Sequence, residues 1–230
     1  MKSTTIASEK THAFYVKLKR SPRAYWFVPE LEHQVKVRKI KIPKQVARGE
    51  FMVTRFGYFN KHAWYFFNND PVSGWLPLKG VRDNYRRLAV NAEKQRTDDL
   101  QGSYVTSALM MLEYVGNELP LTRLRTLLSD NTNGFPMPAD FFTIFVEHVG
   151  SFKNLSNKKL RRIRNQLRRE RPVMMWVKNL SEQNAFAIVL TGFSKKRFFY
   201  INPITGQVNI IDKKQLLKMW KAAGYLAISY

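Results

Sequence analysis

The first third of the chain alternates apolar and polar residues over short runs, the pattern of half-buried β-strands. Five such runs follow one another between Thr11 and Val81: AFYVKLKR, HQVKVRKIKIP, GEFMVTRFGYF, KHAWYFF and SGWLPL. Their number and spacing predict a small all-β barrel over residues 11–81. Residues 1–10 before it are polar and predict a frayed N-terminus.

From residue 100 onward the period changes, first to that of helices and then back to that of strands. Residues 82–99 are polar and charged, which predicts a connector. The expected helices are residues 103–115, 121–128, 138–149, 156–170 and 213–223. The expected strands are residues 173–177, 185–192, 197–202 and 207–211, and the closing run GYLAISY. This order predicts an α+β domain over residues 100–230.

Basic residues outnumber acidic residues by more than two to one. The 39 Lys and Arg and the 17 Asp and Glu give a net charge of +22. Such a charge predicts a polyanionic partner, for which nucleic acid, an anionic membrane and a wall polymer such as teichoic acid all qualify. The alternative is that the charge only keeps the protein soluble in anionic surroundings.

Several kinds of site are excluded or not expected. The chain has no cysteine, which excludes disulfides, thiolate metal sites and a cysteine nucleophile. The four histidines (His12, His33, His62 and His148) lack metal-ligand spacing, so we expect no metal and no cofactor. Apolar runs are too short to span a bilayer. The N-terminus lacks the apolar core of a signal peptide, so either the protein stays inside the cell or a signal peptide is missing from this sequence.

The positive charge is concentrated in the segment SNKKLRRIRNQLRRERP, whose only acidic residue is Glu170. Leu160, Ile163 and Leu167 form a narrow apolar stripe along the predicted helix. Crowded like charges are unfavourable, and arginine forks suit phosphate groups, so we expect a polyanion-binding face rather than a merely solvated one. Its residues are Lys158, Lys159, Arg161, Arg162, Arg164, Arg168, Arg169 and Arg171.

A second basic strip is expected in the β-rich part, where alternation places several cations on one face of a strand. The strip consists of Lys36, Arg38, Lys39, Lys41 and Lys44. By contrast, residues 101–150 hold 2 basic and 5 acidic residues, so the charge is unevenly distributed.

Four motifs in the second part occur in the order of a known family: NAEKQ…DDLQGSYVTSALMMLEYVG, LRRERPVMMWV, AFAIVLTGFSKKRFFYINPITG and LLKMWKAAGYLAIS. Over residues 88–230 they resemble the bacterial papain-like cysteine peptidases of the bacteriocin-leader-processing, or peptidase C39-like, type. The resemblance implies a papain-like fold. In that fold a cysteine at a helix N-terminus is activated by a histidine on a facing strand, which an Asn or Asp orients.

The resemblance also assigns residues to the positions of that site. Ser103 stands at the cysteine position, Phe186 at the histidine position and Asn202 in the turn that carries the family's aspartate. Gln95 lies near the position of the glutamine that helps to hold the oxyanion. Phe cannot act as a general base, so we expect a degenerate peptidase homologue that is not an enzyme.

Ser103 has two other interpretations. As a helix N-cap it would be structural, and Ser is favoured there. A residual serine hydrolase would need a base such as lysine, for which no lysine in the sequence has an obvious place. Phe186 is interpreted as filling the former cleft.

The stretch FGYFNKHAWYFF…SGWLPLKGV resembles the last half of a GW-type, SH3-like cell-wall module, a match carried by Trp64, Tyr65, Gly74 and Trp75. That resemblance implies a surface-anchoring unit that binds lipoteichoic acid or related polymers. The alternative for Trp64 and Trp75 is ordinary core packing.

Together these features predict a non-catalytic, extracellular, cell-surface-associated protein that binds anionic wall polymers such as teichoic or lipoteichoic acid. The vestigial cleft would serve as a scaffold or dock a peptide or protein partner. The first alternative is a cytoplasmic nucleic-acid-binding or regulatory protein, although no helix-turn-helix, zinc-finger or RNP signature is present. The second alternative is a residual hydrolase that uses Ser103.

Overall fold

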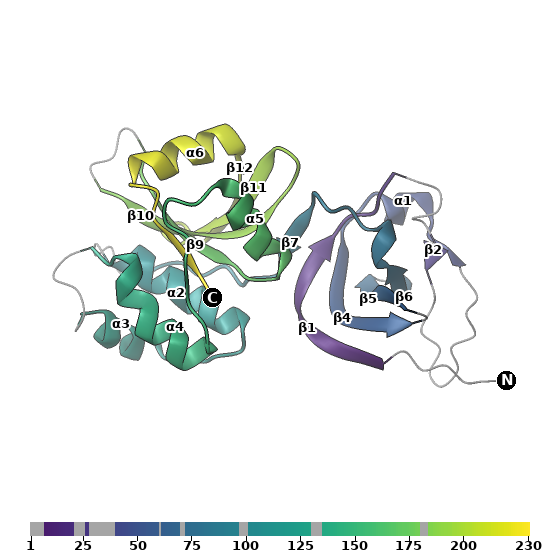
Figure 1. Ribbon diagram of the computed structural model, residues 1–230, viewed down its shortest axis with the longest axis horizontal. Coiled ribbons are helices and arrows are strands. Elements are labelled where there is room, and N and C mark those ends of the chain that lie inside the picture. Colours follow the sequence, from purple (N-terminus) through teal and green to yellow (C-terminus); the bar gives the residue numbers. More distant parts are fainter. Residues whose placement is uncertain are drawn as a thin grey trace. The chain divides into compact units, whose positions relative to one another are not determined.

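The computed structural model (Figure 1) describes residues 7–20, 26–27, 40–59, 61–69, 72–96, 101–129, 135–179 and 184–230. The chain divides into two compact units, Met1–Arg87 and Leu88–Tyr230. The division therefore falls within residues 82–99, the stretch that the sequence predicts as a connector.

The first unit is built mainly of antiparallel strands. Its sheet has the order β6-β5-β4-β1, in which each strand pairs with the next. The strands are β1 (Ala7–Val16), β4 (Phe51–Phe59), β5 (His62–Asn69) and β6 (Val72–Pro77). A separate pair is formed by β2 (Trp26–Phe27) and β3 (Ile40–Lys41), and two short helices are α1 (Lys44–Ala47) and η2 (Leu78–Gly80).

Alternation along the strands of the first unit sends large apolar side chains to a common core. Phe14, Val16, Phe51, Val53 and Phe67 are fully buried. The rings of Phe51 and Phe67 meet edge to face, with centroids 5.2 Å apart, a favourable geometry for aromatic pairs. Aromatic packing therefore supplies much of the core of this unit.

The predicted connector does not begin as a free linker. Val81 forms an antiparallel bridge with Leu18, and the backbone N–H of Arg82 donates to the carbonyl of Lys17 over 2.8 Å. Tyr85 is buried, and β7 (Arg86–Leu88) follows it. This stretch appears polar in the sequence because its charged residues outnumber the buried residues that hold it in place, such as Val81 and Tyr85.

The second unit contains a six-stranded antiparallel arrangement with the order β12-β11-β10-β9-β13-β8. The strands are β8 (Lys153–Asn154), β9 (Val173–Val177), β10 (Phe186–Phe193), β11 (Arg197–Asn202), β12 (Gln207–Asp212) and β13 (Ala227–Ser229). The predicted strands of this unit are confirmed to within about one residue at most ends, because each is bounded by polar or turn-forming residues.

Helices of the second unit cover the sheet. They are α2 (Gly102–Tyr114), α3 (Leu121–Ser129), η3 (Pro138–Phe141), α4 (Phe142–Val149), α5 (Leu160–Arg168) and α6 (Lys213–Ala222). Helix α2 packs on β9 and β10, and eleven of its thirteen residues are buried. Figure 1 shows α2, α3 and α4 grouped together, with α6 on the far side of the strands from them.

The arginine-rich helix is shorter than the sequence predicts. Residues 156–170 were expected to be helical, whereas α5 spans Leu160–Arg168. The Asn154 side chain accepts the Ser156 N–H in a tight turn, and Asn157 has a left-handed φ of 58°. At the other end Glu170 also has a left-handed φ, of 61°. Asn tolerates this conformation better than most residues, so the turn stops the helix from starting earlier.

Substituting Trp220 with alanine should destabilise the protein by about 3–5 kcal/mol. Trp220 is fully buried, and its indole N–H donates to the Leu226 carbonyl over 2.9 Å. The control is Leu217→Ala on the same helix, where the side chain is 39% exposed and the change should stay near about 0.5 kcal/mol. Urea titration of both variants measures the difference, and equal losses would contradict the assigned packing of α6.

Candidate functional site

Ser103 lies in the first turn of α2 and is buried against β10. Its side-chain oxygen accepts the backbone N–H of Ala187 over 3.1 Å, and only 4% of the residue is exposed. The helix begins at Gly102 after Gln101 and has no side-chain cap. The interpretation of Ser103 as the N-cap is therefore wrong, because its hydroxyl serves the neighbouring strand instead of the helix end.

Phe186 is the first residue of β10 and directly precedes Ala187. It pairs with Val177 on β9 and is partly buried. The structure thus brings the predicted nucleophile and base positions to the same point, where α2 begins beside the start of β10. A phenylalanine ring there has no atom that accepts a proton.

Aromatic side chains surround the start of α2. Tyr104 is fully buried, and its hydroxyl donates to the Ala185 carbonyl over 2.9 Å. Burial raises the pKa of Tyr104 well above its usual range, so this hydroxyl stays protonated. Trp176 lies 5.6 Å from the Tyr104 ring and donates its indole N–H to the Pro136 carbonyl over 2.9 Å.

The sequence pattern predicts only that Trp176 lies in a strand. Its partner Pro136 is distant in the sequence, so no local pattern indicates this contact. The hydrogen bonds of Ser103, Tyr104 and Trp176 tie α2, β9, β10 and the segment before η3 together. Where a papain-like site would operate, these side chains make structural contacts.

Asn202 and Gln95 lie at the turn after β11, which the antiparallel pairing of β10 with β11 brings beside the start of β10. The Asn202 side-chain oxygen accepts the Ile204 N–H over 3.0 Å, and its carbonyl accepts the Gly206 N–H over 2.8 Å. The Gln95 N–H donates to the Pro203 carbonyl over 2.7 Å. Within the described part of the chain, the side-chain oxygen of Gln95 is buried without a hydrogen-bond partner.

Gly206 holds this turn against the chain at Lys94. Its φ is 68°, and a Cβ added there would lie 2.9 Å from the Cβ of Lys94, closer than side chains approach. Asn202 therefore shapes a turn on which residues 94–95 pack. The contacts of Gln95 and Asn202 run to this turn, and those of Ser103 run to the start of β10, which lies beside it.

The tryptophans and tyrosine proposed for the β-rich unit are core residues. Trp64, Tyr65 and Trp75 are 8%, 7% and 2% exposed. The Arg55 guanidinium lies 3.8 Å from the centroid of the Phe66 ring, and Arg86 donates to the Tyr65 hydroxyl over 3.3 Å. The structure thus agrees with the core-packing alternative for these side chains.

The basic helix has the predicted apolar stripe, since Leu160, Ile163 and Leu167 are buried. Three of the eight predicted cations contact other groups of the protein. Arg168 donates to the side-chain oxygen of Asn165 over 2.9 Å and lies 5.2 Å from the Phe193 ring centroid. Arg164 donates to the carbonyls of Ser194 and Lys195, 3.1 Å each, and Arg171 donates to the Tyr230 carbonyl over 2.8 Å. The exposed cations are Lys158, Lys159, Arg161, Arg162, Arg168 and Arg169.

Arg164 is the anchor of this face. Its guanidinium lies 5.2 Å from the Phe198 ring centroid and 5.5 Å from that of Phe193. Burial, and then the nearby charge of Arg168, lowers the pKa of Arg164 from its usual value, although a guanidinium remains charged. Arg164 therefore positions the helix, while its neighbours present their charge to solvent.

The second basic strip is described only in part. Lys36, Arg38 and Lys39 lie outside the described residues. Lys41 in β3 and Lys44 in α1 are exposed.

Among the described residues, no group of three or more His, Cys, Asp or Glu side chains is placed to hold a metal ion. His148 lies in α4, and its carbonyl accepts the Asn117 side-chain N–H over 3.0 Å. In the same part of the chain, no helix is long and apolar enough to cross a membrane.

A buried helix that starts beside a strand of an antiparallel sheet is consistent with the papain-like fold of the peptidase class. The sequence profile of the peptidase C39-like family matches residues 87–228. The chain belongs to this family, as the motif order predicts.

One solved structure agrees with this fold, and a second match has a low TM-score. A protein described as a C39-like peptidase from Bacillus anthracis aligns with a TM-score of 0.51 and 17% identity, over 62% of this chain and 94% of that chain. An autolysin candidate from Listeria monocytogenes aligns with a TM-score of 0.30 and 8% identity, over 92% of this chain and 65% of that chain. No curated protein matches significantly.

Ser103→Ala should lower the free energy of unfolding by about 1–3 kcal/mol, because the buried Ala187 N–H loses its acceptor. The matched control is Ser107→Ala, one turn along the same helix. Ser107 is fully buried, and its hydroxyl has no partner within the described residues, so alanine there should be neutral or stabilising. Denaturant titration checks both, and an equal effect would contradict a structural role for Ser103.

Proposed function

We propose that this chain is a non-catalytic member of the peptidase C39-like family and binds anionic polymers of the bacterial cell wall at the cell surface. The observation that carries the proposal is residues 158–169, in which the buried apolar stripe of α5 docks on the sheet and six Lys and Arg side chains in and beside the helix are exposed.

Loss of catalysis is supported by chemistry at three positions. A serine hydroxyl needs a base before it can attack a carbonyl, and Phe186 stands where the family has its histidine. The Ser103 oxygen is buried and accepts the Ala187 N–H. The turn that carries the family's aspartate contains Asn202 followed by Pro203. A substituted base and a substituted orienting residue accompany the substituted nucleophile, which points to a different function for the fold.

Polymer binding is supported by uncompensated charge on α5. Residues 156–171 hold eight basic residues and one acid. Like charges one turn apart each cost roughly 0.2–0.5 kcal/mol, and a bound polyanion removes that cost. Guanidinium forks match phosphate oxygens in bidentate geometry. Teichoic and lipoteichoic acids are phosphate polymers of the required charge.

The first unit contributes a second attachment in this proposal. Its motif resembles a GW-type, SH3-like module, and Lys41 and Lys44 are exposed. An extracellular, surface-associated location is part of the same proposal, since wall polymers are reached there. A vestigial peptide-binding cleft is not needed for this function, because the side chains at the start of α2 already bond to the protein.

The double variant Arg161→Gln, Arg162→Gln should bind purified lipoteichoic acid about tenfold more weakly than the unmodified protein, because two exposed phosphate contacts are lost. The control Arg123→Gln, Lys153→Gln removes two exposed cations from other elements and should change affinity less than about twofold. Titration at several salt concentrations measures both. Tighter binding to nucleic acid than to wall polymer, at equal salt, would support the intracellular alternative instead.

A serine-reactive fluorophosphonate probe should leave Ser103 unlabelled, because no base activates the buried hydroxyl. Intact-mass spectrometry of the full chain after incubation checks the result, with an active serine hydrolase as the positive control. Stoichiometric modification that disappears in Ser103→Ala would contradict the loss of catalysis and support a residual hydrolase.

A further inference from the structure

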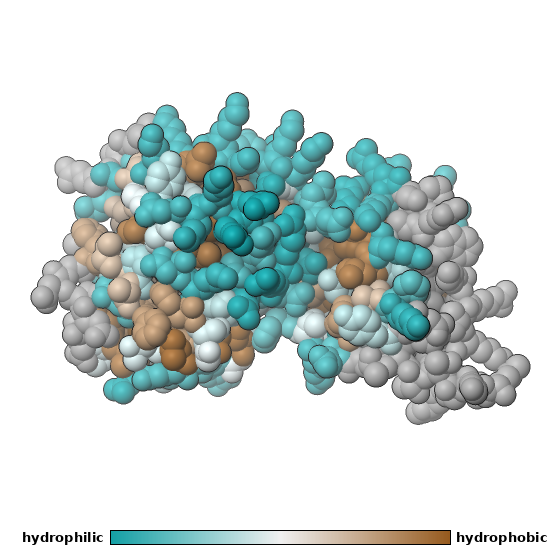
Figure 2. All heavy atoms as spheres, viewed as in Figure 1, coloured by the Kyte–Doolittle hydropathy of each residue, from teal (hydrophilic) through white to brown (hydrophobic). Residues whose placement is uncertain are grey.

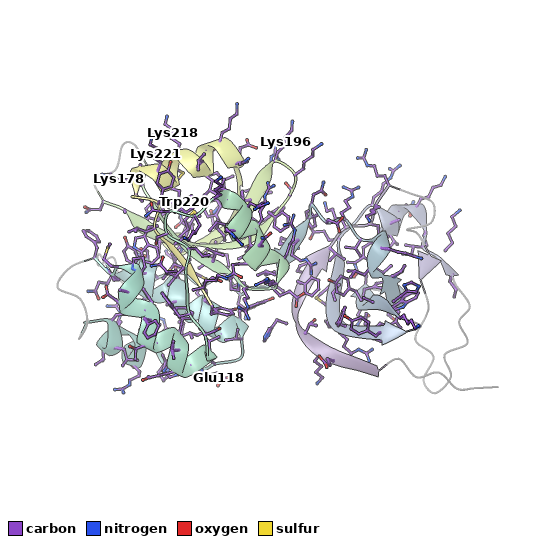
Figure 3. The ribbon with its side chains drawn as sticks, viewed as in Figure 1. Glu118, Lys178, Lys196, Lys218, Trp220 and Lys221 are labelled. Carbon is purple, nitrogen blue, oxygen red and sulfur yellow. The ribbon has the colours of Figure 1, made fainter. Side chains whose placement is uncertain are left out.

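Helix α6 is a second basic helix, for which the sequence analysis predicts no binding face. Its exposed residues include four lysines, Lys213, Lys214, Lys218 and Lys221. Leu216 and Trp220 dock the opposite side of the helix on the domain. Figure 3 shows Lys218 and Lys221 projecting outward from α6, with Lys196 toward the other end of the helix.

One turn, Ser194 to Lys196, ties the two basic helices together. Arg164 of α5 donates to the Ser194 and Lys195 carbonyls, 3.1 Å each. The N–H of Lys213, the first residue of α6, donates to the Lys196 carbonyl over 3.0 Å. In this turn, the side chains of Lys195 and Lys196 are exposed.

The cations of α5 on either side of Arg164, which contacts this turn, are also exposed. Arg161 and Arg168 lie one helical turn on either side of Arg164, so the three arginines lie on the same side of α5. Figure 2 shows mostly hydrophilic residues where Figure 1 places α5 and α6. The exposed charge therefore continues from α5 across the 194–196 turn onto α6.

Acidic residues are scarce along this path. Residues 156–171 and 195–222 together hold 15 basic and 2 acidic residues. Of the two acids, Asp212 pairs with Arg197 over 3.3 Å. In the view of Figure 3, the labelled acid of this unit, Glu118, lies at the opposite end from Lys218 and Lys221.

We infer that α5, the 194–196 turn and α6 form one continuous track for a linear phosphate polymer longer than either helix. This inference rests on the proposed function and extends its site. Each helix alone is about 15 Å long, so a short oligomer reaches only one of them.

The chemistry of the track favours a wall polymer over single-stranded nucleic acid. Binding of single strands relies on exposed aromatic rings that stack on bases. Among the described residues, the large exposed aromatic side chains are Tyr58, Phe135 and Phe142, and none belongs to the track. A polymer recognised through its phosphates alone fits a surface of Lys and Arg.

The test compares two glycerol phosphate polymers, one of about 15 Å, the length of one helix, and one several times longer. The double variant Lys214→Gln, Lys218→Gln should bind the long polymer about tenfold more weakly and the short one within about twofold of the unmodified protein. Arg161→Gln, Arg162→Gln should weaken binding of both polymers. Arg123→Gln, Lys153→Gln is again the control.

The outcomes separate the two proposals. If the α6 variant matches the control on both polymers while the α5 variant weakens binding, the track is wrong and the proposed function stands. If the unmodified protein binds neither polymer, or binds DNA more tightly at equal salt, both proposals are wrong. Salt dependence of the unmodified protein gives an independent readout, because the long polymer should show the steeper slope; equal slopes would also overturn the track.

Discussion

The second unit depends on the burial of α2 against β9 and β10. A helix that is apolar on nearly every side is stable in water only when other elements cover all of it, and here strands and the helices α3 and α4 do so. Two hydrogen bonds fix its start: the Ala187 N–H to Ser103, and the Tyr104 hydroxyl to the Ala185 carbonyl. In an active papain-like enzyme the same helix end activates a nucleophile. In this chain the same helix end makes hydrogen bonds to residues 185 and 187.

In the proposed function, binding takes place away from this helix end. The four positions that the resemblance assigns lie at one end of the β10–β11 pair. The pairing of Val189 with Ile201 brings Asn202 beside the start of β10, where Ser103 and Phe186 lie, and Gln95 binds the turn after β11. The exposed charge lies on α5 and α6, which pack on the domain through the buried side chains of Leu160, Ile163, Leu216 and Trp220. A rigid core carrying a charged exterior suits a binding role, since anchored helices present cations at little entropic cost.

Much of the fold could be predicted from local patterns. The strands of the second unit and the apolar stripe of α5 were predicted nearly as they occur, because their periodicity is strong. The predictions were wrong where a turn or a cap decides the outcome. Asn157 in a left-handed conformation delays α5, and Gly102 begins α2, which removes the N-cap role from Ser103. The short α1 and β7 were missed, since elements of three or four residues carry almost no period.

The sequence by itself determined the family, the absence of a cysteine nucleophile and the excess of positive charge, because these are matters of residue identity and order. Only the tertiary structure decided which cations are available. Arg164 and Arg171 are used by carbonyl groups far away in the sequence, whereas the lysines of α6 join the basic face through a turn that lies between two strands. Hydrogen bonds between distant segments set these roles, and such bonds leave no periodic trace in the chain.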